Sequence, residues 1–278
     1  MEENNTSCIL TIIKNEQEYL DEFIKYHLNL GVGHIFIFED MDSESHKDIT
    51  DKYSADEVTL KNISSILDEN KIKEAIDIKK TQKYSVQHLY LRNAVSYIKN
   101  QYQNKYEWCF LIDNDEFITL ENENNNLNDI LSLYNDYDAL LLRWKCYGAN
   151  GHIKKPNYDE GGLIETYTKE IENELDAPRY HNKTCYKLSA YENSFIKSSH
   201  HYPNNNCNYC NTEFVKDLEA PSYKNIYLRH YITKSWEEFV WKKTQRGFLF
   251  EKARNLNSFF ILNKDMIDKK EELINGIK

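Results

Sequence analysis

The first forty residues place two continuous apolar runs on either side of a helical pattern. Ser7–Ile13 and residues 34–38 are short and apolar at nearly every position, which is typical of strands buried on both faces. Between them, over residues 18–30, apolar side chains recur at helical spacing. A strand, a helix and a second strand in this order form a βαβ unit with a right-handed crossover. The sequence therefore predicts an α/β fold built on a parallel sheet.

A third apolar run, residues 108–113, follows a long helical pattern at 82–103 and runs into Asp113, Asp115 and Glu116. On an extended segment Asp113 and Asp115 point to the same side, because side chains alternate along a strand. In open α/β sheets the carboxyl ends of the strands are where ligands bind. Two carboxylates there favour a site for Mg²⁺ or Mn²⁺. A solvated acidic turn is the alternative that these residues alone leave open.

The rest of the chain adds elements of both kinds. After residue 147 the periodicity is lost, and residues 148–221 are predicted to hold short strands and the contacts to an acceptor. Ser235 and Glu238 have the spacing of a capping box at a helix start. The other predicted elements are a third strand near 75–78, a short helix at 129–134, strands at 137–144 and 226–232, and an amphipathic helix at 235–254.

Composition bounds the class of protein. The chain has 278 residues and 40% hydrophobic content, enough for one large α/β domain. A net charge of −10 disfavours general nucleic-acid binding. The chain opens with acidic residues, and no apolar run reaches the ~20 residues of a spanning helix. Six scattered cysteines fit reduced thiols. We therefore expect a soluble, cytoplasmic protein.

Four sequence blocks in fixed order carry a family resemblance. They are Ile12-Ile13-Lys14-Asn15-Glu16 with the helix and strand that follow; Arg92-Asn93 before Trp108-x2-Leu111-Ile112-Asp113-x-Asp115-Glu116-Phe117; Trp144-x2-Tyr147-Gly148-x2-Gly151-His152 with His200-His201; and Arg229-His230-Tyr231-x2-Lys234-Ser235-x-Glu237-Glu238-Phe239 with Arg246-Gly247. Over residues 7–250 this pattern resembles the glycosyltransferase family 2-like group of bacterial surface-polysaccharide clusters, which is related to glycosyltransferase family 92. One departure is at Glu39-Asp40-Met41-Asp42-Ser43, where relatives commonly carry Asp-Asn-x-Ser.

The resemblance implies a GT-A fold, with a Rossmann-like nucleotide-sugar-binding sheet flanked by helices, an irregular acceptor-side region and a C-terminal helix. We expect a single domain over residues 1–255, with a nucleotide-sugar half at 1–120 and an acceptor half at 121–255, and a helical tail at 256–278. The implied activity is metal-dependent transfer of a sugar from a nucleotide-sugar donor, with a UDP-sugar favoured. The acceptor is a glycan or lipid-linked glycan in surface polysaccharide or lipooligosaccharide synthesis, and inversion is favoured.

The resemblance also assigns roles on the donor side. Asp113 and Asp115, with His230, are the expected ligands of Mn²⁺ or Mg²⁺, which neutralises charge on a leaving nucleotide diphosphate. His230 as a strand-end residue, Arg246 on a solvated helix face and Asn93 as a buried helix polar residue are alternatives that stay open. The expected donor-binding residues are Lys14, Asn15, Glu16, Asp40, Asn93, Asp113, Lys234 and Arg246.

On the acceptor side an inverting transferase needs a general base, usually a carboxylate. Glu165 is the expected base and His152 its alternative, while His200 and His201 are expected to shape the acceptor pocket. The same histidines with Cys207 and Cys210 have the ligand types of a zinc site, which also stays open.

Two alternatives concern the whole protein, and a third concerns one helix. The first is a catalytically inactive carbohydrate-binding protein on the same fold. The second, a nucleotidyltransferase, is disfavoured because Lys14-Asn15-Glu16 is not Gly-rich. The third concerns the helix predicted at 235–254, whose aromatic and basic residues fit either packing on the sheet or peripheral contact with the inner face of a membrane.

Overall fold

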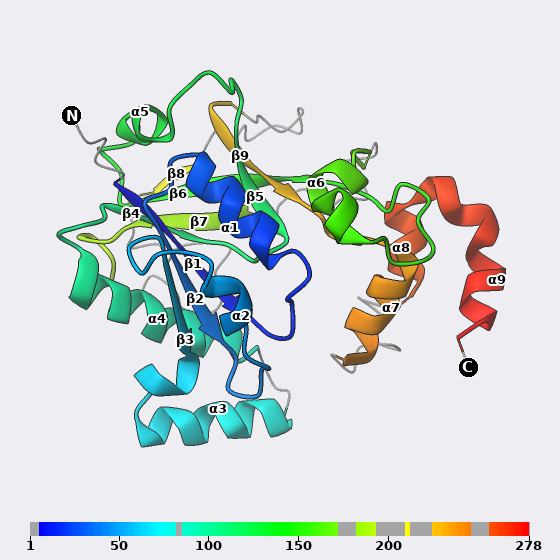
Figure 1. Ribbon diagram of the computed structural model, residues 1–278, viewed down its shortest axis with the longest axis horizontal. Helices are drawn as coiled ribbons and strands as arrows, with labels where there is room; N and C mark the ends of the chain where they lie inside the picture. Colours follow the sequence, from blue (N-terminus) through cyan, green and yellow to red (C-terminus); the bar gives the residue numbers. More distant parts are fainter. Residues whose placement is uncertain are drawn as a thin grey trace. The chain divides into compact units, whose positions relative to one another are not determined.

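The computed structural model describes residues 6–81, 85–171, 182–192, 209–211, 224–245 and 256–277. Within these residues nine strands form one sheet in the order β3-β2-β1-β4-β7-β6-β9-β5, and β8 pairs with β6 beside this path (Figure 1). The strands are β1 Ser7–Ile13, β2 His34–Glu39, β3 Val58–Asn62, β4 Trp108–Leu111, β5 Glu116–Leu120, β6 Ala139–Cys146, β7 Asn182–Lys187, β8 Tyr209–Asn211 and β9 Ile226–His230.

Helices connect the strands and follow the last of them. In chain order they are α1 Leu20–Asn29, α2 Lys47–Thr50, the 3₁₀ turn η1 Ile63–Ile66, α3 Glu69–Thr81, α4 Gln87–Tyr102, α5 Leu127–Ser132, the 3₁₀ turn η2 Tyr158–Glu160, α6 Gly162–Thr166, α7 Trp236–Gln245, α8 Asn257–Leu262, the 3₁₀ turn η4 Lys264–Lys269 and α9 Lys270–Asn275. Among the described residues no helix is long and apolar enough to cross a membrane.

The chain divides into two compact units. The first comprises residues 1–143 and 181–228, and the second comprises 144–180 and 229–278. The expected division at residue 120 differs from these boundaries, and the assignment of a donor half and an acceptor half stays a prediction.

The parallel part of the sheet confirms the predicted βαβ unit. β1 pairs in parallel with β2 on one side and with β4 on the other, and β2 pairs in parallel with β3. The crossovers from β1 to β2 and from β3 to β4 therefore run in opposite directions across the sheet. Right-handed crossovers then require α1 and α4 on opposite faces, so that helices cover both (Figure 1). The α/β fold class expected of a GT-A enzyme is confirmed by this topology.

The core on one face of the sheet corrects one predicted element. Leu10 and its register partners Phe36 and Leu111 share this face and pack against residues of α3 and α4. Ala75 and Ile78 are buried in the same cluster, but they lie on helix α3. Their spacing of three residues matches a helix stripe, so the strand predicted near 75–78 is wrong. The third strand is β3, seventeen residues earlier.

Strand β7 comes from the stretch without periodicity. It pairs antiparallel with both β4 and β6, so one of the short strands expected within residues 148–221 lies within the sheet. Its register places Thr184 opposite Leu111, the last residue of β4. The neighbouring Lys183 is consequently held next to the turn that follows β4.

In the second unit the C-terminal helices pack on α7. The cluster contains Trp236 and Phe239 of α7 with Phe259 and Phe260 of α8. The predicted capping box is confirmed, because Ser235 Oγ accepts from the Glu238 amide at 3.2 Å and the Ser235 amide donates to Glu238 Oε2 at 3.2 Å. Over residues 256–277 the structure has α8, the 3₁₀ turn η4 and α9, and the division of this tail from the preceding domain stays a prediction. Helix α7 is described to residue 245, so the end predicted at 254 lies outside the described residues.

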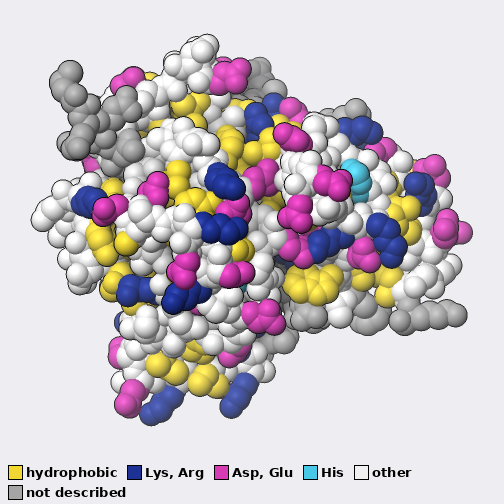
Figure 2. Space-filling view, in the orientation of Figure 1, with side chains coloured by type: hydrophobic (Ala, Val, Ile, Leu, Met, Phe, Trp, Pro, Cys, Tyr) yellow, Lys and Arg dark blue, Asp and Glu magenta, His cyan; other side chains and the backbone are white. Residues whose placement is uncertain are grey.

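The described surface carries both signs of charge. On the face shown in Figure 2, Lys and Arg side chains alternate with Asp and Glu rather than gathering in one basic patch. Exposed Trp241 lies on α7, where the interfacial-helix alternative was raised.

Candidate donor and metal site

Four parallel strands bring polar residues to one edge of the sheet. The carboxyl ends of β1, β2, β3 and β4 meet there, because these strands all run in the same direction. Asn15, Asp40 and Asp113 follow three of them within two residues, and Asn62 ends the fourth. The prediction that these strand ends form the ligand-binding edge is consistent with this geometry.

The residues after β4 form a tight turn. The amide of Glu116 donates to the carbonyl of Asp113 at 3.0 Å, and the Asp113 amide donates to Glu116 Oε2 at 3.0 Å. Asp115, inside the turn, is only 2% exposed. The assumption of an extended segment was wrong, so side-chain alternation is not what relates the two aspartates. The turn itself brings three acidic residues together at the end of the strand.

Both oxygens of the Asp113 carboxylate contact protein donors. Oδ1 accepts from Gln87 Nε2 at 2.9 Å, at the start of α4. Oδ2 accepts from Lys183 Nζ at 2.7 Å, on β7. The same ammonium lies 3.4 Å from Glu116 Oε2. Lys183 was not a predicted site residue, because it lies in the stretch without periodicity.

Burial and neighbouring charges together shift the pKa values of Glu116 and Lys183. It raises the pKa of the fully buried Glu116 carboxyl well above its usual value, and the nearby Lys183 only partly opposes this. Burial alone would lower the pKa of Lys183, but the carboxylates of Asp113 and Glu116 outweigh it and raise that pKa. Lys183 is therefore a positive charge inside the protein, held next to the acidic turn.

The donor atoms of the turn suit a hard divalent cation. Asn114 Nδ2 donates to the carbonyl of Glu16 at 3.3 Å, while its buried Oδ1 has no hydrogen-bond partner among the described residues. This oxygen and the carboxylates of Asp113 and Asp115 are the ligand type of Mg²⁺ and Mn²⁺. No group of three or more His, Cys, Asp or Glu within the described parts of the chain is arranged to hold a metal. The fit is thus to a cation that takes its remaining ligands from water or phosphate.

The loop after β1 is fastened to the loop after β2. Asn15 adopts a left-handed backbone conformation with φ of 53°, which asparagine tolerates better than most residues. Its Oδ1 accepts from the amide of Glu44 at 2.9 Å, and its own amide donates to Ser43 Oγ at 3.1 Å. These bonds hold the peptide between Asn15 and Glu16, both predicted donor contacts, in one conformation.

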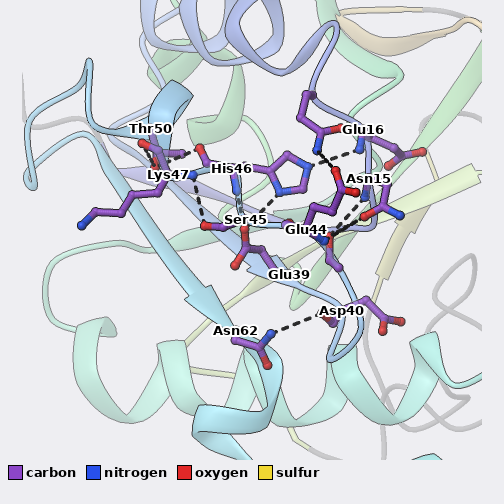
Figure 3. A network of polar contacts seen from close by, with 12 residues as sticks. Asn15, Glu16, Glu39, Asp40, Glu44, Ser45, His46, Lys47, Thr50 and Asn62 are labelled. Carbon is purple, nitrogen blue, oxygen red and sulfur yellow. Dashed lines mark hydrogen bonds and ion pairs between the residues drawn. The ribbon is translucent and has the colours of Figure 1, made fainter.

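His46 supports the same loop from inside the protein (Figure 3). Its ring is fully buried, and Nε2 accepts from the amide of Glu16 at 3.2 Å. Glu39 Oε1 accepts from His46 Nδ1 at 3.0 Å and from the His46 amide at 2.6 Å. Since Nε2 accepts a hydrogen bond, the ring proton is on Nδ1. Neither Glu39 nor His46 was a predicted site residue, because their burial depends on contacts between separate loops.

Asp40 forms an ion pair with Lys79. Its side chain and that of Asp42 both accept from Lys79 Nζ on α3, the latter at 2.7 Å. The bond from Lys79 lowers the pKa of the Asp42 carboxyl. The backbone carbonyl of Asp40 accepts from Asn62 Nδ2 at 3.3 Å, which joins the ends of β2 and β3 (Figure 3).

Two other predicted donor residues differ in their surroundings. Lys14 is exposed directly after β1. Asn93 is half-buried on α4, where its Oδ1 accepts from Lys71 Nζ at 2.5 Å and its Nδ2 donates to the carbonyl of Leu89 at 2.7 Å. Both ends of the Asn93 amide thus form hydrogen bonds within the protein, as expected if Asn93 is a buried polar residue of the helix. Its contact with the nucleotide-sugar donor stays a prediction.

His230 and Lys234 belong to the second unit. His230 ends β9, is 8% exposed, and its ring centroid lies 4.1 Å from that of Trp144. Lys234 is 4% exposed and has φ of 54°. The other residues besides glycine with positive φ in the described chain are all asparagines, which favour that conformation. A lysine held there is a backbone outlier of the kind found at functional sites.

The two residues expected to act as base also lie in this unit. The backbone carbonyl of His152 accepts from the amide of Trp236 at 3.1 Å. The His152 ring packs edge-on against the ring of Tyr167, with 5.6 Å between the ring centroids. Glu165 is exposed on the short helix α6. No contact assigns either of them to an acceptor, so both roles stay predictions.

Several predicted residues lie outside the described part of the chain. This applies to His200, His201, Arg246 and Cys207. Cys210 lies on β8, where the backbone pairs with β6. The zinc alternative and the predicted acceptor pocket therefore stay predictions.

The sequence matches that of a known protein family over most of its length. Residues 3–268 match the sequence profile of glycosyltransferase family 92. The chain belongs to glycosyltransferase family 92. It is also 27% identical over 243 residues to a family 92 protein of rice, Oryza sativa subsp. japonica, in a match that covers 84% of this chain and 34% of the relative. The chain thus spans about a third of the length of that family 92 relative. The narrower family 2-like grouping stays a prediction.

Solved structures resemble this family 92 chain only weakly. HddC from Yersinia pseudotuberculosis has a TM-score of 0.34 at 10% identity, covering 81% of this chain and 89% of its own. Glucosyl-3-phosphoglycerate synthase from Mycobacterium tuberculosis, solved with Mn²⁺, UDP and phosphoglyceric acid, has a TM-score of 0.32 at 10% identity, covering 66% of this chain and 56% of its own. At these scores neither structure informs the activity of this chain.

Proposed function

We propose that this family 92 chain is a metal-dependent glycosyltransferase. It transfers a sugar from a nucleotide-sugar donor, with a UDP-sugar favoured, to a glycan or lipid-linked glycan acceptor. The observation that supports this most is the Asp113–Asp115 turn, joined through Asn114 to the loop after β1 at the carboxyl edge of the parallel strands. Inversion at the sugar and a role in surface polysaccharide synthesis are the finer parts of the proposal, and they rest on the sequence resemblance.

The nucleoside would bind against the loops after β1 and β2. Asn15 and Glu16 present a backbone fixed by Ser43, Glu44 and His46, so little conformational entropy is lost when a ligand binds there. In the second unit, Lys234 and Arg246 are the residues proposed to bind the leaving diphosphate, since ammonium and guanidinium groups pair well with phosphate oxygens.

Asp113 and Asp115 would hold the cation, with His230 as the proposed third protein ligand. A bound Mn²⁺ or Mg²⁺ supplies positive charge to the leaving nucleotide diphosphate. The carboxylate of Glu165, or alternatively the imidazole of His152, would take the proton from the acceptor hydroxyl. His200 and His201 would contact the acceptor.

The decisive experiment is a thermal-shift comparison. The wild-type chain is heated with UDP, GDP or CMP, each with and without Mn²⁺, beside Asp115→Ala and the control Asp129→Ala, which removes an exposed carboxylate from α5. We expect one nucleotide to raise the melting temperature only with Mn²⁺, because a ligand that binds the folded state stabilises it. The effect should vanish in Asp115→Ala and persist in Asp129→Ala.

The alternative of an inactive carbohydrate-binding protein predicts a different result. No nucleotide would stabilise the chain with or without Mn²⁺, while an oligosaccharide would do so. That outcome rejects the transferase proposal. If a nucleotide does bind, release of the nucleoside diphosphate from the matching nucleotide sugar in the presence of a glycan acceptor measures turnover directly.

A further inference from the structure

Lys183 is a buried cation beside the acidic turn. Its side chain is 1% exposed, on a strand that lies between β4 and β6. Nζ donates to Asp113 Oδ2 at 2.7 Å and lies 3.4 Å from Glu116 Oε2. Removing a lysine ammonium from water is unfavourable unless opposite charges and hydrogen bonds replace the lost hydration. The acidic turn provides both.

The acidic turn in its turn is stabilised by the lysine. Asp113, Asp115 and Glu116 fall within four positions, and the last two are 2% and 0% exposed. Carboxylates this close and this buried repel one another unless a cation lies among them. In the described part of the chain Lys183 is such a cation, and its pairing with Asp113 and Glu116 helps the turn to keep its shape before any metal binds.

A divalent metal at Asp113 and Asp115 would share these carboxylates with Lys183. Two positive charges near one carboxylate repel each other, and the repulsion is strong where water is excluded. A nucleotide diphosphate adds negative charge and further oxygen ligands, which offset that repulsion. The metal and the nucleotide should therefore bind together more readily than the metal binds alone.

We propose that Lys183 is a resident cation of the acidic turn, which holds Asp113 in place and keeps the affinity for a divalent metal low until a nucleotide diphosphate arrives. This inference rests on the proposed function, because it takes Asp113 and Asp115 as the metal site. Lys183 acts through Asp113 and is a positioning residue.

Metal binding is measured directly by titrating Mn²⁺ and following the electron paramagnetic resonance signal of the free ion, without and with UDP. The variants are Lys183→Met, which keeps an unbranched side chain one atom shorter and removes the charge, and the control Lys187→Met. Lys187 lies four residues further on β7 and is 18% exposed, and it pairs with Glu107 at 3.1 Å instead of the acidic turn.

We expect Lys183→Met to bind Mn²⁺ alone at least about tenfold more tightly than the wild type, because the competing charge is gone. UDP should then improve Mn²⁺ affinity much less in Lys183→Met than in the wild type. Lys187→Met should match the wild type in both titrations. Without metal, the Lys183→Met variant should also have a lower melting temperature than the wild type. Addition of Mn²⁺ should restore most of this difference in melting temperature.

Unchanged or weaker Mn²⁺ binding by Lys183→Met, while the wild type binds Mn²⁺ with UDP, overturns the inference and leaves the proposed function standing. If neither protein binds Mn²⁺ under any condition, the proposed metal site itself fails, and the inference fails with it. If Lys183→Met does not fold alone, restoration of cooperative melting by Mn²⁺ supports the inference, and failure of Mn²⁺ to restore it overturns it.

Discussion

The imidazole of His46 accepts the backbone N–H of Glu16 at 3.2 Å, thirty residues away in the sequence. Through its other nitrogen the ring binds the carboxylate of Glu39 at 3.0 Å. Glu39 is the last residue of β2, so the contact fixes the loop after β1 to the end of the neighbouring strand. A side chain without any predicted contact to substrate thereby determines the shape of a predicted nucleotide loop.

Replacing His46 with Phe should affect both stability and donor binding. The Glu16 amide loses its acceptor and Glu39 Oε1 loses the ring donor, although it keeps the bond from the backbone amide of residue 46. We expect these losses to lower the free energy of unfolding by about 2 kcal/mol. If the loop contacts the donor as proposed, in ground and transition states alike, the KM for the nucleotide sugar should rise several-fold with a smaller change in kcat. Urea denaturation and steady-state kinetics measure the two effects.

His34→Phe is the matched control for this variant. His34 is also buried and begins the same strand, where it binds the Asp56 carbonyl at 2.8 Å and Thr59 Oγ1 at 2.9 Å. It should cost similar stability and leave the KM unchanged. Equal KM values for the two variants would mean that the His46 contact has no bearing on the donor.

Lys234 allows the strain of its backbone to be separated from the role of its side chain. Lys234 has a backbone φ of 54°, which is unfavourable for alanine but not for glycine. Lys234→Gly therefore relieves the strain that Lys234→Ala keeps, and both variants remove the ammonium group. We expect the glycine variant to be more stable than the alanine variant by about 1 kcal/mol. If Lys234 binds the diphosphate, kcat/KM should fall by at least about tenfold in both variants. Equal stability would show that the positive φ stores no strain.

Gly148 is required by its contact with the C-terminal tail. A Cβ at this position would lie 2.7 Å from Asn263 Oδ1, which accepts from the Ala149 amide at 2.5 Å. Gly148→Ala should therefore lower the free energy of unfolding by about 1–3 kcal/mol. Gly161→Ala is the control, since its nearest contact is the flexible end of Glu165 at 3.3 Å. Chemical denaturation should find the control close to the wild type, and equal losses would contradict the proposed clash.

His27 should make the fold sensitive to acid. Burial lowers its pKa to about 3, while Nε2 accepts from the Ile118 amide at 3.1 Å. An unfolded chain, with an ordinary histidine pKa near 6.5, binds more protons between these values, so stability falls as pH decreases from about 6.5 towards 3. The slope from this residue alone approaches about 1.4 kcal/mol per pH unit.

His27→Gln tests this linkage. The variant has no titrating ring, so its free energy of unfolding should depend less steeply on pH between 6.5 and 4 than that of the wild type. Carboxylates common to both proteins cancel in the difference between the two curves. Parallel curves would contradict the assignment of this pH dependence to His27.

Local patterns in the sequence were sufficient for much of the fold. The apolar runs at β1 and β2 and the helix between them were predicted because residues buried on both sides of a strand, or on one side of a helix, repeat at short intervals. The capping box at Ser235 and Glu238 was also predictable, since its partners lie three residues apart. The error at residues 75–78 arose where a short apolar run fits a strand and a helix equally well.

Short-range patterns are therefore enough to predict the parallel strands and the acidic residues at the end of β4. How those residues are held depends on contacts between segments that lie far apart in the chain. Lys183 lies seventy positions from Asp113 and looks like a surface residue until β7 pairs with β4. His46 looks equally ordinary until the loops after β1 and β2 meet around it. The burial and the charge pairing of these two residues come from segments that are distant in the chain, so no local sequence pattern predicts them.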